Sequence, residues 1–279
     1  MIGHSMKKSL QWALALVALL SLVLGTSAVA KPTVVAIDQL RADERQRQTA
    51  LIITQVMEKF HYLKPRLDDE MSSAVLDRYL ESLDANRSFF SARDVAAFER
   101  YRLTLDDSLR TGKLDPAFQI FRRFRERVEQ RVAFALDRLQ TNQFDFAIDE
   151  EYRFDRSEAE WLPDQAALDD LWRRRIKNDI LSLRLSGKAE PEIKKTLTKR
   201  YQSISRRVTQ MEPTDVFQAF INAFTLSVEP HTSYMSPRLS ENFDIGMRLS
   251  LQGIGAVLRS DNEFTEIQST VPGGPAESS

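Results

Sequence analysis

A nearly unbroken helical spacing of apolar residues runs through most of this 279-residue chain, from about Ile37 to about Phe243. The apolar side chains recur at steps of three and four residues, which places them along one face of a helix. The pattern is clearest in the stripe formed by Phe118, Phe121, Phe124, Val128, Val132, Ala135 and Leu139. Because each stripe has to be buried against another element, the sequence predicts a mainly α fold built by helix-on-helix packing.

Local signals indicate where several of these helices begin and end. Asp115 followed by Pro116 suits a helix start, and Ser91 with Asp94 three residues later is typical of a capping box. Pro213 ends one stripe, after which Thr214 is expected to cap the next helix. Gly187 is expected to close a helix in the left-handed conformation.

Other stripes are predicted to contribute to the same core. They comprise Ile52, Val56, Met57 and Phe60; Met71, Val75, Leu76 and Tyr79; Leu168, Leu171, Trp172, Ile176, Ile180 and Leu183; Ile193, Leu197, Tyr201, Ile204, Val208 and Met211; and Phe217, Phe220, Ile221 and Phe224. At this spacing, aromatic residues indicate core packing rather than a cofactor site.

The composition excludes several classes of function. The 39 basic and 40 acidic residues nearly balance, so the basic excess of a nucleic-acid-binding protein is missing. The absence of cysteine excludes disulfides, thiolate metal sites and cysteine nucleophiles. No phosphate-binding glycine motif occurs, and no cofactor or metal is expected. Glu126 and Glu129 interrupt the arginine-rich stretch 122–131, and Asp169, Asp170 and Asp179 lie near the arginines at 173–175, which indicates solvated, ion-paired helix faces.

The N-terminal segment has the three parts of a secretory signal peptide. Lys7 and Lys8 precede an apolar stretch from Leu10 to Leu24, and Ala28-Val29-Ala30 supplies a cleavage site. The apolar stretch is short for a permanent membrane anchor, which needs ~20 residues. Residues 1–30 are therefore predicted to be a cleavable signal peptide, with export to the periplasm and no stable membrane anchor afterwards.

The sequence changes in character after Asp244. Met247, Leu249 and Leu251 alternate with polar residues, and two strands are expected around a turn at 260–262, the second over 264–269. A two-stranded ribbon is at most marginally stable in isolation. The chain is therefore divided into a helical domain, residues 31–245, and the first strands of an incomplete β-rich domain, residues 246–279.

No residue has the surroundings of a catalytic group. His61 lacks a second metal-type residue at ligand spacing, and His231 lies in a loop that is expected to close on its own hydroxyls and hydrogen-bond the helices. The carboxylate groups at 68–70 and 149–151 are interpreted as solvated helix ends. We therefore predict no catalytic residue in this chain.

The glycine loop after the helices is the strongest physical lead. Gly253 and Gly255 flank Ile254 and allow positive φ angles, which bring backbone amides close to a ligand. Successive amides in such a turn form a concave anion site. The terminal carboxylate of a peptide, with a pKa of ~3.5, is ionised at neutral pH and suits that site.

Three runs of sequence resemble the carboxyl-terminal processing peptidases, and among them the tail-specific proteases of the Prc type. They are LDANRSFF at 83–90, SVEPHTSYMSP at 227–237 and LSLQGIGAVL at 249–258. Glu229 stands where aspartate is more usual in this family. The resemblance implies a helical N-terminal domain, then a PDZ domain that binds substrate C-terminal tails, then a protease core with a serine–lysine dyad.

Carried over to this sequence, the resemblance assigns a substrate-tail site and no catalytic residue. The carboxylate-binding loop matches Gly253, Ile254, Gly255 and Ala256, with Leu251 and Val257 as pocket neighbours. The expected partners are proteins with apolar C-terminal tails and a periplasmic adaptor protein. The dyad is expected to lie outside this sequence, so the chain alone is predicted to be inactive. The alternative is a non-enzymatic periplasmic helical protein that binds partners or acts as a scaffold.

Overall fold

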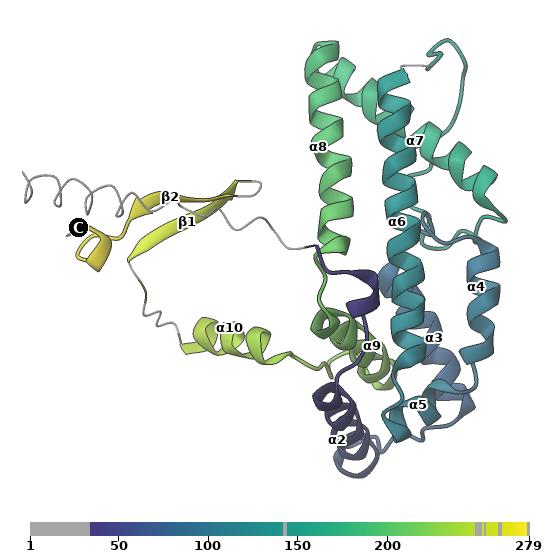
Figure 1. Ribbon diagram of the computed structural model, residues 1–279, viewed down its shortest axis with the longest axis vertical. Helices are drawn as coiled ribbons and strands as arrows, with labels where there is room; N and C mark the ends of the chain where they lie inside the picture. The colour runs from purple at the N-terminus through teal and green to yellow at the C-terminus, as the bar shows by residue number, and fades with distance from the viewer. Residues whose placement is uncertain (1–33, 142–143, 249–252, 254, 262–263, 278–279) are drawn as a thin grey trace, which may run out of the picture.

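A computed structural model of the chain describes residues 34–141, 144–248, 253, 255–261 and 264–277, and the predicted signal peptide lies outside these residues. The helical region is a bundle built on α6 (Asp115–Thr141), which runs along its length (Figure 1). α7 (Gln165–Leu185) and α8 (Glu190–Thr209) pack beside the second half of α6. Shorter helices surround its first half, namely α2 (Glu44–Phe60), α3 (Asp69–Leu83), α4 (Ala92–Phe98), α5 (Leu105–Thr111) and α9 (Pro213–Val228). The predicted mainly α architecture is confirmed.

The predicted stripes form one continuous core. All seven apolar residues of the α6 stripe are buried, and they meet Trp172 and Ile176 of α7 together with Phe220 and Phe224 of α9. Aromatic rings pack edge to face in this core, as between Tyr79 and Phe220, whose centroids are 5.4 Å apart. This arrangement confirms that the aromatic spacing serves packing.

The stripe assigned to α2 was wrong on one side. Met57 is buried, but Ile52, Val56 and Phe60 are 62%, 47% and 78% exposed. The residues of α2 that face the bundle are Gln46, Ala50, Thr54 and Met57. The helical period was correct, but the flank with the larger side chains is exposed in the part of the chain that the structure describes.

Two of the predicted helix boundaries are confirmed and one is corrected. Ser91 and Asp94 form the expected reciprocal capping box at the start of α4. Gly187 has φ +81°, and Lys188 donates its amide to the carbonyl of Leu183, as in a Schellman end. α9 begins at Pro213 rather than after Thr214. Its capping residue is Glu212, whose backbone amide donates to Asp215 (2.8 Å).

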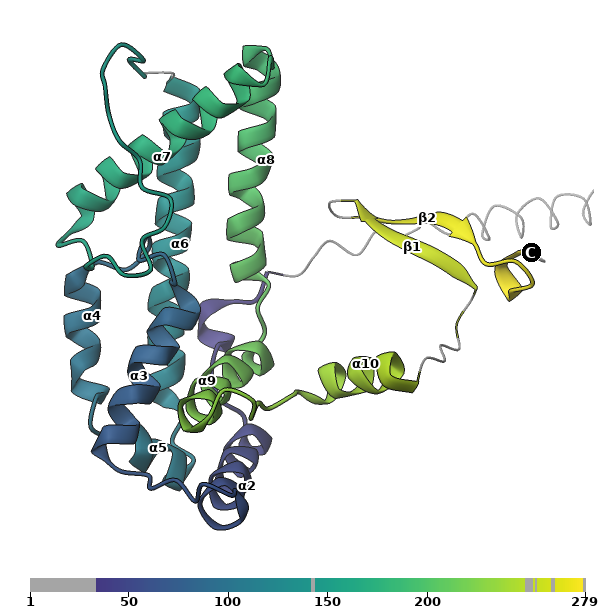
Figure 2. The same cartoon turned by 180° about the vertical axis from the view of Figure 1, so that it is seen from behind.

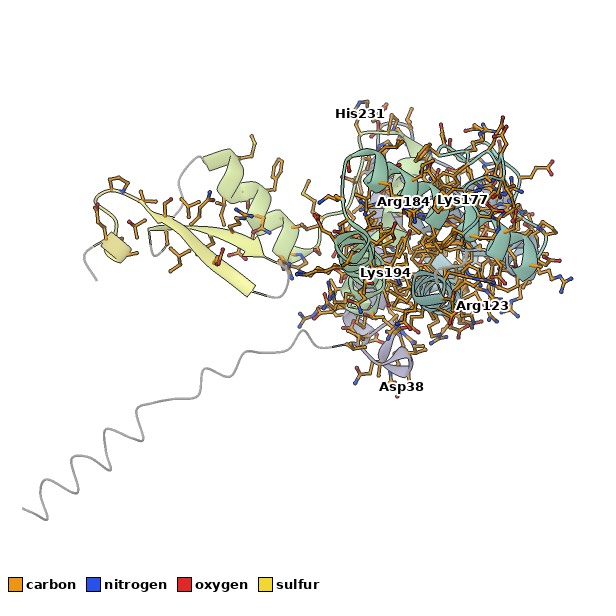
Figure 3. All side chains as sticks on the ribbon, turned by 90° about the horizontal axis from the view of Figure 1, so that it is seen from above. Asp38, Arg123, Lys177, Arg184, Lys194 and His231 are labelled. Atoms are coloured by element: carbon orange, nitrogen blue, oxygen red, sulfur yellow. The ribbon has the colours of Figure 1, made fainter. Side chains whose placement is uncertain are left out.

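The chain leaves the bundle through α10 (Pro237–Arg248), an amphipathic helix that extends beside it (Figure 2). Met247, which was expected in a strand, belongs to this helix because Leu239, Phe243 and Met247 share one helical face. These three side chains are 43%, 52% and 68% exposed. Figure 3 shows the side chains of the bundle as one dense group, with α10 and the β strands at its side.

Two antiparallel strands follow, β1 (Ala256–Asp261) and β2 (Phe264–Thr270). Ala256 pairs with Thr270 and Asp261 with Phe264, with an irregularity between Val257 and Leu258. The expected hairpin is confirmed, although Ser260 and Asp261 belong to the first strand rather than to the turn. The remaining short elements are 3-10 turns at Ile37–Gln39, Glu99–Tyr101 and Pro275–Glu277.

Candidate functional site

The glycine loop lies immediately before β1, and the structure describes part of it. Gly255 has φ +72°, the positive value expected of this loop, whereas Gly253 is not among the glycines with positive φ. Leu251 and Ile254 lie outside the described residues. Ala256 is half-buried and Val257 is 45% exposed.

Gly255 is also held in a close contact between backbone segments. Its carbonyl accepts the amide of Val271 (2.7 Å), and a Cβ atom added to it would lie 2.9 Å from the α carbon of Gly274. A side chain at position 255 would therefore displace the 271–275 segment. The requirement for glycine here has two causes, the positive φ and this contact.

The 229–236 segment closes on itself and binds the bundle, as expected. Thr232 donates to Glu229 and lies 3.2 Å from Nε2 of His61 at the end of α2. His231 lies 3.2 Å from the same Glu229 but is largely exposed. The hydrogen bond from Thr232 lowers the pKa of Glu229. Glu229 is therefore an anchor in its ionised form rather than an acid poised to release a proton.

The next residues of this segment are held by α9. The amide of Tyr234 donates to Asn222 (2.7 Å), and the amide of Ser236 donates to Gln218 (3.0 Å). The ring of Tyr234 packs on that of Phe217. These contacts fix the point from which α10 leaves the bundle, so the 229–236 segment positions the helix that follows it.

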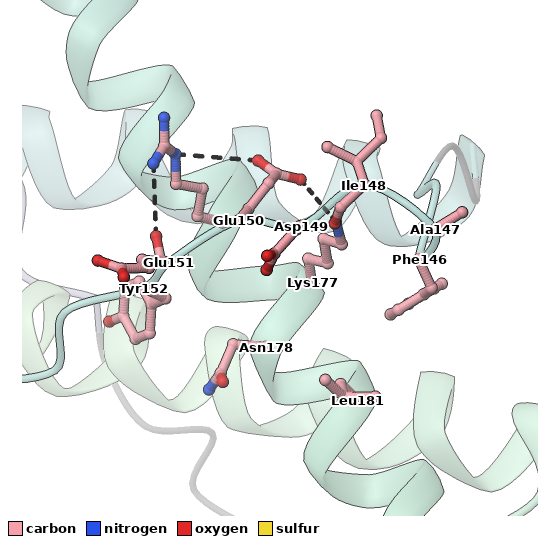
Figure 4. A pocket seen from close by; sticks show the side chains of 11 residues that line it. Phe146, Ala147, Ile148, Asp149, Glu150, Glu151, Tyr152, Lys177, Asn178 and Leu181 are labelled. Atoms are coloured by element: carbon pink, nitrogen blue, oxygen red, sulfur yellow. Dashed lines mark hydrogen bonds and ion pairs between the residues drawn. The ribbon is translucent and has the colours of Figure 1, made fainter.

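The carboxylates at 149–151 do not form a solvated helix end. They lie in the loop between α6 and α7, beside a cavity of about 320 Å³ (Figure 4). Glu150 is only 13% exposed and binds Nζ of Lys177 (2.6 Å) and the guanidinium of Arg173 (3.0 Å). Hydrogen bonds from Arg173 and Lys177 lower its pKa to about 2. Such a carboxylate stays ionised near neutral pH, so it cannot serve there as a general acid.

The acidic run at 68–70 lies at a helix end, as interpreted, because Asp68 caps α3 by accepting the amide of Met71 (3.2 Å).

The arginine-rich stretches are only partly the solvated, ion-paired faces that the sequence indicates. Arg125 and Arg131 are buried, each 4% exposed, and Arg131 binds Asp169 on α7. They connect elements inside the bundle, which the pattern of charges along one helix does not reveal.

Arg173 and Lys177 were not predicted as the partners of Glu150. Their spacing of four residues places them on one face of α7, which was the available signal.

The described residues contain no cluster of three histidine, aspartate or glutamate side chains able to hold a metal ion. Within the same residues, no helix has the length and apolar character of a membrane span.

Comparisons with known proteins agree with the helical architecture. A family model described as the tail specific protease N-terminal domain matches residues 53–238. The chain is also 38% identical over 250 residues to a tail-specific protease from Haemophilus influenzae. That similarity covers 89% of this chain and 36% of the relative, so the chain spans just over a third of the relative's length. The chain belongs to the tail-specific protease family, and its helical bundle corresponds to the N-terminal domain of these proteins.

Proposed function

We propose that this chain forms the N-terminal part of a periplasmic serine endopeptidase that selects proteins by their C-terminal tails. Family membership supports the protease over the alternative of a non-enzymatic scaffold. The observation that carries the tail-binding role is the backbone of Gly255, which has a positive φ directly before a strand. The tail would end against the amides of residues 253–256.

The local chemistry suits a terminal carboxylate with an apolar last side chain. Amides in a glycine turn offer several donors to one anion. The exposed face of Val257, together with Leu251, would receive the apolar side chain. Upstream residues of the tail would add a strand beside β1, as in other peptide complexes that extend a sheet. In this proposal residues 246–279 begin a PDZ domain.

Cleavage is assigned to a serine–lysine dyad outside these residues. The lysine of such a dyad has to be neutral to accept the proton of the serine, which burial favours. The helical bundle would frame the access of substrates and offer a surface to a periplasmic adaptor protein. Residues 1–30 would direct export and then be removed.

The test uses the protein expressed from its complete gene and two substrates that differ only at the C-terminus, one a free acid and the other an amide. Loss of the terminal charge is expected to lower kcat/KM at least ~10-fold, mainly through KM, because charge-assisted hydrogen bonds are lost. Val257→Glu should lower kcat/KM for the free-acid substrate in the same way. Gly246→Ala, in α10, should preserve the preference. Equal cleavage of acid and amide substrates would contradict the proposal.

A further inference from the structure

A group of arginines without carboxylate partners lies around the loop between α6 and α7. Among the described residues, Arg87, Arg153 and Arg156 form no ion pair with an aspartate or glutamate, unlike the neighbouring Arg173 and Arg174. Arg87 instead donates to the carbonyl of Ala159 and lies 5.4 Å from the ring centre of Trp161. Arg87 and Arg156 are half-buried, where cations are normally paired, whereas Arg153 is exposed. Asp155 and Asp84 act on Arg153 and Arg156 as opposite charges without forming an ion pair with them.

Arg156 carries the clearest sign of an unmet interaction. Its Nε atom is buried and has no hydrogen-bond partner among the described residues, and its Nη2 makes one long bond, 3.4 Å, to the carbonyl of Glu160. Burial lowers its pKa, and the charges of Arg153 and Arg87 lower it further. Asp84 opposes this shift, but its carboxylate already accepts the amides of the 88–90 turn. The buried Nε has no surface open to a ligand, so an anion in the adjoining cavity would reach this guanidinium through its Nη atoms, of which only Nη2 makes a hydrogen bond within the described residues.

Arg153 and Arg156 line a cavity of about 290 Å³ whose other walls are mixed in character. Leu162 and Leu171 contribute apolar surface, while Glu151 and Asp170 place carboxylates at the same cavity. These carboxylates repel a doubly charged phosphate more strongly than a singly charged carboxylate, and they can accept main-chain amides of a peptide. The volume is near the lower limit of ligand pockets, ~300 Å³, so only a short end of a chain would enter.

The LDANRSFF run at 83–90, which the tail site does not involve, holds the backbone that carries Arg156 into this cavity. Asn86 donates to the carbonyl of Phe154 (2.9 Å) and accepts the amide of Arg156 (3.1 Å). The turn thereby holds the 154–156 backbone in place, so the arginine at 156 is positioned before any ligand arrives. Such preorganisation lowers the cost of binding.

We propose that Arg153 and Arg156 bind a carboxylate of a polypeptide, with Leu162 and Leu171 receiving the adjacent apolar side chain. This second peptide site lies on the helical domain and rests on the proposed function only in assuming that the protein handles polypeptides. The carboxylate can belong to a chain terminus or to an acidic side chain, and both have the same chemistry for the guanidinium fork.

The test measures the tryptophan fluorescence of the 279-residue chain and assigns to Trp161, which lies against Arg87, the part of the response that is lost in Trp161→Phe. The probes are a short peptide ending in Leu-Ala as the free acid, its amide, the amide with an internal aspartate, and inorganic phosphate. The free acid should change the emission at concentrations at least ~10-fold lower than the amide. Binding of the aspartate peptide at similar strength would support the site and assign the ligand to side chains. Equal binding of acid and amide, or tighter binding of phosphate, would overturn the proposal.

Substitutions separate this site from the glycine loop. Arg156→Gln should weaken the Trp161 response at least ~10-fold, and Arg156→Lys should restore part of it. Arg153→Gln removes an exposed charge and is expected to weaken binding less without affecting folding. Arg184→Gln, which breaks an ion pair with Glu190 elsewhere on α7, is the matched control and should leave the response unchanged. An unchanged response in both Arg153→Gln and Arg156→Gln would refute the site. Val257→Glu should not alter the Trp161 response, so failure of one site is distinguishable from failure of the other.

Discussion

At the scale of single residues, three glycines allow the cost of a positive φ to be separated from the cost of crowding. Gly187→Ala adds a Cβ in open space at φ +81° and should lower the free energy of unfolding by about 1 kcal/mol. Gly112→Ala should cost more, because its Cβ would also lie 3.2 Å from the carbonyl of Arg47. Gly246→Ala, in α10 and without positive φ or close neighbours, should leave the free energy of unfolding unchanged or raise it by up to ~1 kcal/mol, because alanine favours a helix. Urea denaturation measures all three, and equal costs would contradict the account.

The ion pairs of Glu150 predict how stability depends on pH. The pKa is about 2 in the folded protein and ~4.3 in an unfolded chain, so the folded state favours the ionised form. The resulting stabilisation is complete above the unfolded value and is lost as pH falls from there towards 2.

Comparison with Glu150→Gln at each pH isolates this contribution. The difference in the free energy of unfolding between the two proteins should be constant above about pH 6 and shrink below ~4.5. A difference that stays constant down to pH 2.5 would show that Arg173 and Lys177 do not hold the carboxylate in its ionised form.

Residue-level predictions succeeded where the chemistry is local. The box of Ser91 and Asp94 and the end at Gly187 each involve partners within five residues, so the sequence itself contains both sides of the interaction. Glu150 and Lys177 are 27 residues apart, and their pairing depends on how the loop returns to α7. The order of residues in the sequence does not indicate that the loop folds back onto α7.

At the scale of elements, α2 shows what helical periodicity cannot establish. The period identified the helix, but Ile52, Val56 and Phe60 lie beside the buried stripe rather than in it. Choosing between two flanks requires knowledge of the packed neighbours, which here leave the larger residues uncovered. Met247 is a similar case. Its alternation with polar residues suited a strand, but it lies in α10, which begins at Pro237 and carries Leu239 on the same face.

Substitutions on the two faces of α2 should change the free energy of unfolding by very different amounts. Met57→Ala should lower the free energy of unfolding by about 2–5 kcal/mol, because it leaves a cavity in the core. Phe60→Ser, three residues further on and 78% exposed, should change it by less than ~0.5 kcal/mol. Thermal and urea denaturation of the two variants measure the difference. A large loss in Phe60→Ser would mean that this flank is buried in the folded chain.

At the scale of the whole molecule, one amphipathic helix connects the helical bundle to the hairpin (Figure 1). The sequence predicted both parts, because the bundle's stripes and the hairpin's alternation are regular over many residues. The proposed tail-binding role depends on the few residues before β1, where the sequence offers glycines but no ligand geometry. The proposed export predicts that the chain is shortened at its N-terminus. N-terminal sequencing of protein from the periplasmic fraction should begin at Lys31, whereas an intact Met1 would contradict cleavage.

Hydrogen exchange tests the central claim most directly, since that claim concerns backbone amides. The protein from the complete gene is compared alone, with an apolar peptide carrying a free C-terminus, and with the amidated peptide. We predict slower exchange at residues 253–257 with the free acid and little change with the amide. Unchanged exchange at these residues with the free acid, or equal protection by both peptides, would contradict the assignment of Gly255 and its neighbours to the carboxylate.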